Sequence, residues 1–534
     1  MQLSDRLTRW QWAGLAAVVV IALITLLRSS SIAQQDPISV FLTTNGSADT
    51  SNEATDSQQA SKFHLLIPAS GPHFRVCRAI ASATMMGYPV PVLNGWMQEG
   101  DLDASQSHLA KVRTTMNYLE GLPEDADDDL VLMIDGYDVT FQIPLDVLIE
   151  RYFTVNKAAN AKLAARFGIE TIESLSGDDT PRQTILFGPE KVCYPVDINR
   201  VGCWAIPHDV DIPDGAFGPS DGDWAHNIPL WLNSGTIIGP VHDMRRMFAA
   251  TLERIEKYYD PGHEFSDSDQ KYMSDVWGVQ EYARSIKELE MYFHGDVYPP
   301  DVVPDPDSGK VIPELQPDQH TEFHIGIDYR SALFQTNAGS EHYVEFLTYN
   351  ATSNINTNTS MTNSTNTRPS TWVTRDVSSG AHNFKPYQIF LPRNLAQSIM
   401  RLFRGIAHVV DRIPHITELP LQTNIVTKNV HGLFHYTGEK DHMDDVWGQM
   451  WFYPYGRELF EAAVKRLNAN HTIGIADGRR WTHAHVLPNS SVTGARAAGA
   501  LDDELNWIGW EEMCHIYEGK LFVKKGNVSR PHLD

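Results

Sequence analysis

One short stretch constrains the fold of this chain more than any other, because it carries two acids to the end of a buried strand. Leu130 to Ile134 are apolar, Asp135 and Asp138 follow, and the chain becomes apolar again at Val139. Burial of an ionised carboxylate is strongly unfavourable unless a partner compensates its charge. We therefore expect both aspartates to face a ligand or a counter-charge where the strand ends.

Apolar strands and amphipathic helices alternate before this stretch. Strands are predicted at 62–70, 89–96 and 130–134, with helices over 74–88 and 107–122 between them. Strand, helix and strand in succession are typical of a parallel sheet with right-handed crossovers. Ligands of such sheets bind beyond the carboxyl ends of the strands, which is where the two aspartates lie.

The pattern continues downstream, where residues 350–370 interrupt it. This Thr/Asn/Ser tract is predicted to form a surface loop. The other segments with clear periodicity are strands within 182–195, 228–240 and 323–336, and helices over 242–259, 268–285 and 395–410.

Two carboxylates three residues apart can hold a hard divalent cation, which also contacts phosphate oxygens. Such a cation would neutralise Asp135 and Asp138, and it would stabilise the charge on a diphosphate leaving group. The simpler alternative is an Asp-Gly turn that the second aspartate caps. The strand context favours neither alternative decisively.

The first 61 residues indicate entry into the secretory pathway. We interpret 1–9 as a cytoplasmic tail, 10–28 as a transmembrane signal anchor and 29–61 as a flexible stem. The alternative is a cleaved signal peptide, for which 31–33 would serve as the cleavage site. Either interpretation places the rest of the chain in a lumen, and the anchor predicts a single-pass type II protein of the Golgi or endoplasmic reticulum membrane.

Sequons, cysteines and charge agree with a lumenal domain. Cys193 and Cys203 are close enough to close a short loop as a disulfide, although four buried thiols are the alternative. The net charge of −24 argues against nucleic acid as a partner. The seven Asn-x-Ser/Thr sequons begin at Asn45, Asn350, Asn358, Asn363, Asn470, Asn489 and Asn527.

Five short motifs follow one another between residues 130 and 336. They are LVLMIDGYDVTF (130–141), PEKVCYP (189–195), LWLNSGTIIG (230–239), DQKYMSDVW (269–277) and IDYRSALFQT (327–336). In this order they resemble the glycosyltransferase domain of the procollagen lysyl hydroxylase/glucosyltransferase and procollagen galactosyltransferase families. Each motif is weak alone, whereas the ordered set is specific.

The resemblance implies a GT-A fold, an α/β architecture with a Rossmann-like, mostly parallel sheet flanked by helices. It would span 62–452, with 453–534 as a C-terminal extension. It also implies Mn²⁺ or another divalent cation, a UDP-sugar donor, and transfer of a hexose to a protein or glycan acceptor. The implied site comprises the metal-binding Asp135 and Asp138, the substrate-binding Ala69, Ser70, Lys111, Tyr137, Asn233, Ser234 and Gly235, and the catalytic acids Asp269 and Glu190.

A third metal ligand, a histidine from late in the chain, is expected from the same resemblance. His431 resembles the His-Gly of the collagen-modifying families, whereas His435, Gly438 and Lys440 resemble the His-x-x-Gly…Lys segment of other retaining GT-A enzymes. We favour His435 because Gly438 and Lys440 follow it. Lys440 would then contact the diphosphate as a point charge.

The outcome at the anomeric carbon stays open. Inversion needs a base near the acceptor, for which Asp269 or Glu190 would serve, whereas retention can use the leaving diphosphate as base. A catalytically silent lectin-like or scaffold protein on the same fold is the alternative function. An iron centre formed by His442, Asp444 and His483 is a weaker alternative, because the region lacks the strands of a β-rich barrel.

Overall fold

The computed structural model describes residues 60–170, 177–207, 210–292, 302–317, 319–354, 367–376, 384–469, 471–488 and 494–523. These residues belong to one compact unit, Gln58–Asp534. The predicted cytoplasmic tail, the signal anchor and nearly all of the stem lie outside the described residues. Among the helices that are described, none has the length and apolar character that crossing a membrane requires.

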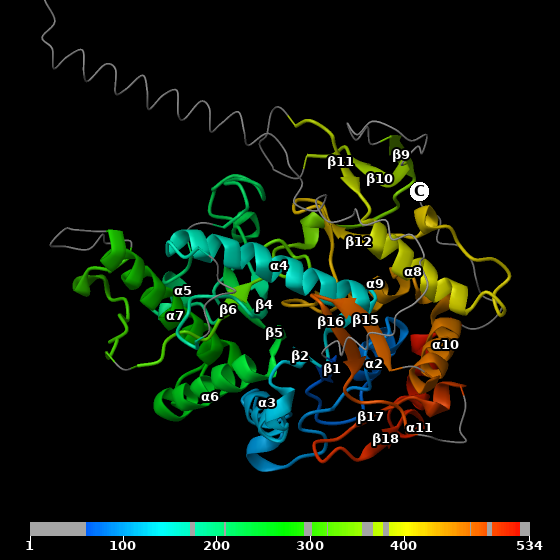
Figure 1. Ribbon diagram of the computed structural model, residues 1–534, viewed down its shortest axis with the longest axis horizontal. Coiled ribbons are helices and arrows are strands. Elements are labelled where there is room, and N and C mark those ends of the chain that lie inside the picture. The colour runs from blue at the N-terminus through cyan, green and yellow to red at the C-terminus, as the bar shows by residue number, and fades with distance from the viewer. Residues whose placement is uncertain are drawn as a thin grey trace, which may run out of the picture. The chain divides into compact units, whose positions relative to one another are not determined.

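A mixed sheet of seven strands forms the centre of the α/β unit (Figure 1). Strands β16, β1, β2, β4 and β6 run in one direction, whereas β5 and the edge strand β15 run against them. The prediction of a mostly parallel sheet flanked by helices is therefore confirmed. In spatial order the strands are β15 (Thr472–Ala476), β16 (Arg479–His483), β1 (Ala60–Leu66), β2 (Leu130–Ile134), β5 (Trp231–Pro240), β4 (Ile185–Glu190) and β6 (Ile325–Ile327).

Alternate residues of the central strands point to opposite faces, so each face has its own set of helices. On one face, Val131 and Met133 pack against α3 (Ala110–Glu120), α6 (Val241–Tyr258) and α7 (Asp269–Tyr292). On the other face, Leu130 and Leu132 belong to a core with α2 (Phe74–Met85), α4 (Leu145–Arg166), α8 (Arg393–Gly405) and α10 (Gly456–Ala469). Figure 1 shows α3 and α6 on one side of the sheet and α4 on the other.

A second, three-stranded sheet connects distant parts of the chain at the end of β2. It consists of β3 (Val139–Phe141), β14 (Leu433–His435) and β7 (Phe334–Thr336). The central strand, β14, is antiparallel to β3 and parallel to β7. Because β3 follows β2 after four residues, this sheet brings the segment around residue 435 next to the two aspartates.

The predicted strand at 89–96 does not form, and this prediction is wrong. Val92 makes only isolated bridges to Leu66 and Leu501. Pro89 and Pro91 have no N–H to donate, so a continuous ladder cannot form across this segment.

The predicted surface loop at 350–370 is wrong at both ends. Its ends are strands β9 (Ala351–Asn354) and β10 (Thr367–Val373), which pair antiparallel, and β11 (Tyr387–Phe390) extends this small sheet. Residues 355–366 lie outside the described residues.

The remaining helices and strands of the described residues are β8 (Val344–Leu347), β12 (Leu421–Asn424), β13 (Asn429–Val430), β17 (Gly499–Leu501), β18 (Trp507–Gly509), α5 (Val201–Trp204), α9 (Met443–Gln449), α11 (Trp510–Met513) and α12 (Glu518–Leu521).

The segment 453–534 is part of the same compact unit rather than an appendage to it. Its strand β16 pairs with β1 in the central sheet, and its helix α10 packs against α2. A disulfide between Cys77 and Cys514 joins α2 to this segment, a pairing that the sequence does not predict. The predicted Cys193–Cys203 disulfide is confirmed.

Candidate metal centre

A tight turn between β2 and β3 carries the two aspartates. The backbone N–H of Asp135 donates to the carbonyl of Gly235 at 2.8 Å, which fixes the start of the turn on β5. A Cβ at Gly136 would lie 2.1 Å from the carbonyl oxygen of Pro68, so only glycine allows this approach to the chain that follows β1. Asp138 is buried, whereas 31% of the Asp135 side chain is exposed. The turn therefore presents one sheltered carboxylate and one that solvent reaches.

His435 completes a group of three possible metal ligands with Asp135 and Asp138. The three side chains each offer one ligand atom, and all of these atoms lie within 4.8 Å of one another. The Nε2 atom of His435 lies 3.5 Å from Asp135 Oδ2 and 3.4 Å from Asp138 Oδ1. Of the described residues, no other group of three or more His, Cys, Asp or Glu side chains meets this condition. This group could hold a metal ion.

Asn233 sets the tautomer of His435. The Nδ1 atom of His435 lies 2.9 Å from Asn233 Oδ1, and the same oxygen accepts the backbone N–H of Gly235 at 3.0 Å. The amide nitrogen of Asn233 points the other way and donates to Glu190 Oε2 at 2.8 Å. An amide oxygen can only accept, so Nδ1 carries a hydrogen and Nε2 is directed at the two carboxylates. Metal-binding histidines are commonly oriented by such a bond.

The charge of the site favours a cation between His435 and the carboxylates. Burial opposes a charged imidazole, but Asp138, Asp135 and Glu190 outweigh burial and raise the pKa of His435. One imidazole nitrogen and two carboxylate oxygens also form a ligand set that suits a divalent first-row metal, which would replace the proton on Nε2. Asp138 Oδ1 is buried without a hydrogen-bond donor among the described residues, as a metal ligand would be.

A bulge in β5 provides the floor of the centre. Phe187 pairs with Ile237 and the adjacent Gly188 pairs with Asn233, so the three residues 234–236 have no partner on β4. Bulges of this kind redirect side chains next to functional sites. A Cβ at Gly235 would lie 2.0 Å from His435 Cε1 and 2.7 Å from Asp135 Oδ2. The glycine therefore leaves the space that the imidazole and the carboxylate occupy.

Each of the two aspartates is paired with a lysine. Lys111, from α3, lies 2.8 Å from Asp135 Oδ1 and 2.7 Å from Asp269 Oδ2. Burial opposes its charge, but the two carboxylates outweigh burial and raise the pKa of Lys111. Lys440 contacts Asp138 Oδ2. Burial would raise the pKa of Asp138, yet His435 and Lys440 together hold it well below its ordinary range.

Glu190 is a buried carboxyl at the end of β4. Its side chain accepts from Asn233, and its Oε1 atom has no hydrogen-bond partner among the described residues. Burial is the main cause that raises the pKa of Glu190 to about 7. A carboxyl group with this pKa can accept or release a proton near neutrality, as general acid–base catalysis requires.

Asp269 begins α7 and is held differently from Glu190. Burial would raise its pKa, but the ion pair with Lys111 dominates and lowers the pKa of Asp269. The next residue, Gln270, was not predicted as part of the site. Its Oε1 atom accepts the backbone N–H of Ser234 at 3.2 Å and lies 3.3 Å from Asn233 Nδ2. The Asp-Gln pair in the sequence was the available signal for this residue.

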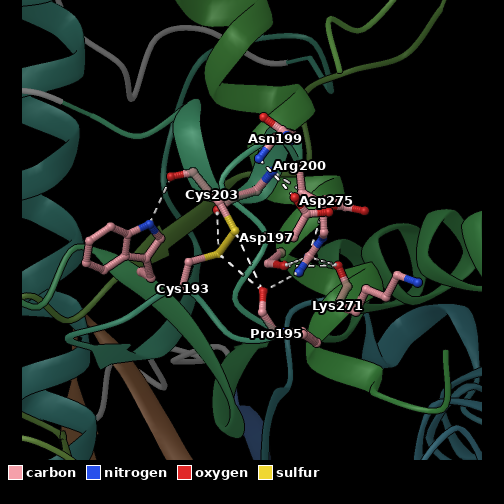
Figure 2. The surroundings of a disulfide bond; sticks show 11 residues. Cys193, Pro195, Asp197, Asn199, Arg200, Cys203, Lys271 and Asp275 are labelled. Atoms are coloured by element: carbon pink, nitrogen blue, oxygen red, sulfur yellow. Dashed lines mark hydrogen bonds and ion pairs between the residues drawn. A yellow bond between two sulfur atoms is a disulfide. The ribbon is translucent and has the colours of Figure 1, made fainter. Parts of the chain in front are cut away.

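A disulfide and an arginine connect the chain after Glu190 to the start of α7 (Figure 2). Cys193 and Cys203 close the loop, and Arg200 within it reaches the first turns of α7. The guanidinium donates to the carbonyl of Lys271 at 2.7 Å and to Asp275 Oδ1 at 3.1 Å. This bracing fixes β4 and α7 relative to each other, and with them Glu190 and Asp269.

Ser70 and Tyr137 meet at the other edge of the centre. The hydroxyl of Tyr137 accepts the backbone N–H of Ser70 at 3.0 Å and lies 2.9 Å from its Oγ atom. Ala69 is buried, and its N–H donates to the carbonyl of Asn94. The half-buried Tyr137 ring packs edge-on against His73. The predicted residues of the segment that follows β1 and of the turn after β2 are therefore adjacent.

The other possible metal ligands considered in the sequence, His431, His442, Asp444 and His483, do not join Asp135 and Asp138. His431 is buried, lies 3.2 Å from Gln422 Oε1 through Nε2, and has its pKa lowered by burial to about 3. His483 instead bonds to the carbonyl of Gly87, and Asp444 pairs with Arg78. His442, Asp444 and His483 do not form a ligand group among the described residues.

Two cavities of about 200 and 210 Å³ are lined by other parts of the chain and share Asp146, Arg401 and Ile473. Asp135, Asp138 and His435 line neither cavity.

Comparison with models of protein families and with curated proteins finds no match for this chain.

Proposed function

We propose that this chain is a metal-dependent glycosyltransferase on a GT-A fold. It would move a hexose from a UDP-sugar to a protein or glycan acceptor in the lumen of the secretory pathway. The observation that carries this proposal is the group of Asp135, Asp138 and His435 at the end of β2, with the imidazole oriented by Asn233. The ordered motifs that resemble the collagen-modifying glycosyltransferases support the choice of substrate class.

The residues that fit the metal are the two aspartates and His435. When bound, Mn²⁺ or a similar divalent cation supplies Lewis-acid stabilisation of the charge that develops on a leaving diphosphate. Asp135 and Asp138 would hold their carboxylates toward the cation, and His435 would offer Nε2 because Asn233 keeps its hydrogen on Nδ1.

The two edges of the centre would bind different substrates. Ser70 and Tyr137 would lie beside the uridine, since they contact each other beyond the carboxyl ends of the parallel strands β1 and β2. Lys440 would contribute a positive charge toward the diphosphate. Asn233, Ser234 and Gly235, in the β5 bulge, would border the acceptor side.

Glu190 is the better placed of the two predicted catalytic acids to move a proton. Its pKa of about 7 allows it to take a proton from an acceptor hydroxyl at neutral pH, which inversion requires. Asp269 is committed to Lys111, and its lowered pKa makes it a weak base. Asp269 would instead hold Lys111, and through it Asp135, in position.

The decisive experiment follows UDP release from a panel of UDP-sugars by the purified full chain, with Mn²⁺ or with EDTA. We expect Mn²⁺-dependent release of UDP and a rise of several degrees in the thermal midpoint with Mn²⁺ and UDP together. Asp138→Asn should abolish both effects, whereas Asp445→Asn, an exposed acid on α9, should preserve them. If neither Mn²⁺ nor UDP shifts the midpoint of the wild type, the silent lectin-like or scaffold alternative is favoured.

A further inference from the structure

The two lysines that pair with the aspartates differ in their number of partners and in their exposure to solvent. Lys111 meets Asp135 and Asp269, and its ammonium lies 3.4 Å from the carbonyl of Ser234. Only 8% of the Lys111 side chain is exposed, whereas 39% of the Lys440 side chain is exposed. Asp138 is the one ion-pair partner of Lys440 among the described residues. The Lys440 ammonium can therefore move into water at a small cost in free energy. The same movement of the Lys111 ammonium would leave two carboxylates without this partner.

The backbone around Lys440 also permits a change of direction. Lys440 follows Gly438, whose φ of +75° marks a turn between β14 and α9. A Cβ at Gly438 would meet Ala338 at an ordinary distance of 3.5 Å, so the turn is not wedged against its neighbours. His435, by contrast, lies within β14 and is hydrogen-bonded to Asn233. The imidazole is anchored by Asn233, whereas the Lys440 ammonium is partly exposed and is paired with Asp138.

Lys440 and a metal ion would compete for the same carboxylate. Asp138 faces His435 with Oδ1 and Lys440 with Oδ2. A divalent cation on Asp138 would remove the negative charge that holds Lys440, and two cations at one carboxylate repel each other. An ammonium released beside the centre would find its next strong acceptor in a diphosphate.

We propose that Lys440 is a metal-gated lysine. In the metal-free protein its ammonium neutralises Asp138, and metal binding frees it for the diphosphate of the nucleotide sugar. This inference rests on the proposed function and adds an order of binding, in which the metal precedes the nucleotide. It also assigns the two lysines different roles, because Lys111 stays on Asp135 throughout.

The inference predicts opposite effects of one substitution on two ligands. In Lys440→Met no ammonium competes for Asp138, so the metal binds more tightly, but the diphosphate loses its cation. A lysine that served only to bind diphosphate would leave metal affinity unchanged. A lysine with only a structural role would lower the thermal midpoint in EDTA without strengthening metal binding.

The test measures Mn²⁺ binding to the full chain from the electron paramagnetic resonance signal of free Mn²⁺. We expect the Kd for Mn²⁺ to fall about five- to tenfold in Lys440→Met, the range for loss of one partly exposed competing charge. Lys440→Arg retains the charge and should stay near the wild-type value. Lys465→Met, an exposed lysine on α10, is the matched control and should change nothing.

A second measurement follows UDP binding by calorimetry at saturating Mn²⁺. Lys440→Met should weaken UDP binding at least about tenfold, as expected for loss of one charge-assisted contact. Lys440→Gln provides a second neutral variant if the methionine variant has a lowered thermal midpoint in EDTA.

The outcomes separate this inference from the proposed function. Unchanged or weaker Mn²⁺ binding in Lys440→Met and Lys440→Gln overturns the gate, even if the wild type transfers sugar. Tighter Mn²⁺ binding with unchanged UDP binding overturns the transfer of Lys440 to the diphosphate. Tighter Mn²⁺ binding in a chain that binds no UDP supports the gate and contradicts the proposed donor. Absence of Mn²⁺ binding by the wild type overturns both proposals.

Discussion

His435 and Asn233 are 202 positions apart in the sequence, yet a 2.9 Å hydrogen bond joins the imidazole of one to the side-chain oxygen of the other. This bond connects the second small sheet to the bulge of the central sheet. It leaves Nε2 as the only ring nitrogen that can face Asp135 and Asp138. The geometry of the candidate metal centre therefore depends on a residue outside the group of possible ligands.

Asn233→Ala should weaken Mn²⁺ binding by about 10- to 100-fold, the usual effect of losing the residue that orients a metal-binding histidine. The imidazole would then be free to rotate and to change tautomer. Titration of free Mn²⁺ by electron paramagnetic resonance measures this. The idea fails if the variant binds Mn²⁺ as the wild type does while its fold, followed by circular dichroism, is unchanged.

Gly235→Ala should abolish metal binding because its Cβ would lie 2.0 Å from His435 Cε1, far inside contact distance. The imidazole or the bulge must move, and the ligand atoms would separate. Gly448→Ala is the matched control, because a Cβ at that helical position meets nothing within 4 Å. Equal Mn²⁺ affinity in the two variants would contradict the geometry described for the bulge.

Glu190→Gln should change how stability depends on pH in metal-free protein. The folded-state pKa of about 7 lies above the ordinary value of 4.5, so the folded chain holds this proton more tightly than the unfolded chain. The wild type therefore loses free energy of unfolding as pH rises from 4.5 to 7. The glutamine variant lacks this loss, which amounts to roughly 3 kcal/mol, an order-of-magnitude figure from 1.36 kcal/mol per pKa unit.

Urea denaturation of both proteins in EDTA at pH 4.5, 6 and 8 checks this expectation. The difference in stability should grow with pH in favour of glutamine and level off above pH 7. A difference that stays constant from pH 4.5 to 8 would show that Glu190 titrates at its ordinary pKa. The same variant should lose UDP-sugar transfer if Glu190 is the proton acceptor.

The two disulfides should contribute unequally to stability. Cys77–Cys514 closes a loop with a sequence separation of 437, whereas Cys193–Cys203 has a separation of 10. The chain-entropy model gives roughly 6 kcal/mol for the long loop and roughly 3 kcal/mol for the short one. The pair of substitutions Cys77→Ser and Cys514→Ser should therefore lower the denaturation midpoint more than Cys193→Ser with Cys203→Ser.

The reverse order of midpoints would contradict this prediction. Cys193→Ser with Cys203→Ser should instead affect function, because Arg200 in that loop braces α7. We expect weaker UDP-sugar turnover in this variant with nearly unchanged Mn²⁺ affinity.

Local pattern was sufficient to predict the elements that surround the two aspartates. The strand at Leu130–Ile134 and the helices α2, α3, α6 and α7 form where periodicity indicates. A helix or strand that packs one face against the core can be predicted from its own sequence, because its apolar residues recur with the period of that element. The strand predicted at 89–96 failed because two prolines remove donors from a segment that is apolar enough to be buried.

The partners of the site residues could not be predicted in the same way. The sequence indicates that Asp135 and Asp138 need a cation, but Lys111 and Lys440 reach them from other segments, and Asn233 orients His435 from a third. The choice of His435 over His431 depended on neighbouring residues rather than on geometry. Strand β15 is largely exposed and lacks a buried alternating face, so nothing in its sequence indicated that it joins the central sheet.

The pairing of β16 with β1 has a consequence for how the protein is made. Strand β1, the first of the described strands to leave the ribosome, has as one of its two neighbours a strand that ends only at His483. Until that segment is synthesised, one edge of β1 has no partner and Phe63 lacks part of its packing. The central sheet can be completed only near the end of translation, so a chain interrupted before residue 472 should expose an unpaired sheet edge and bind chaperones.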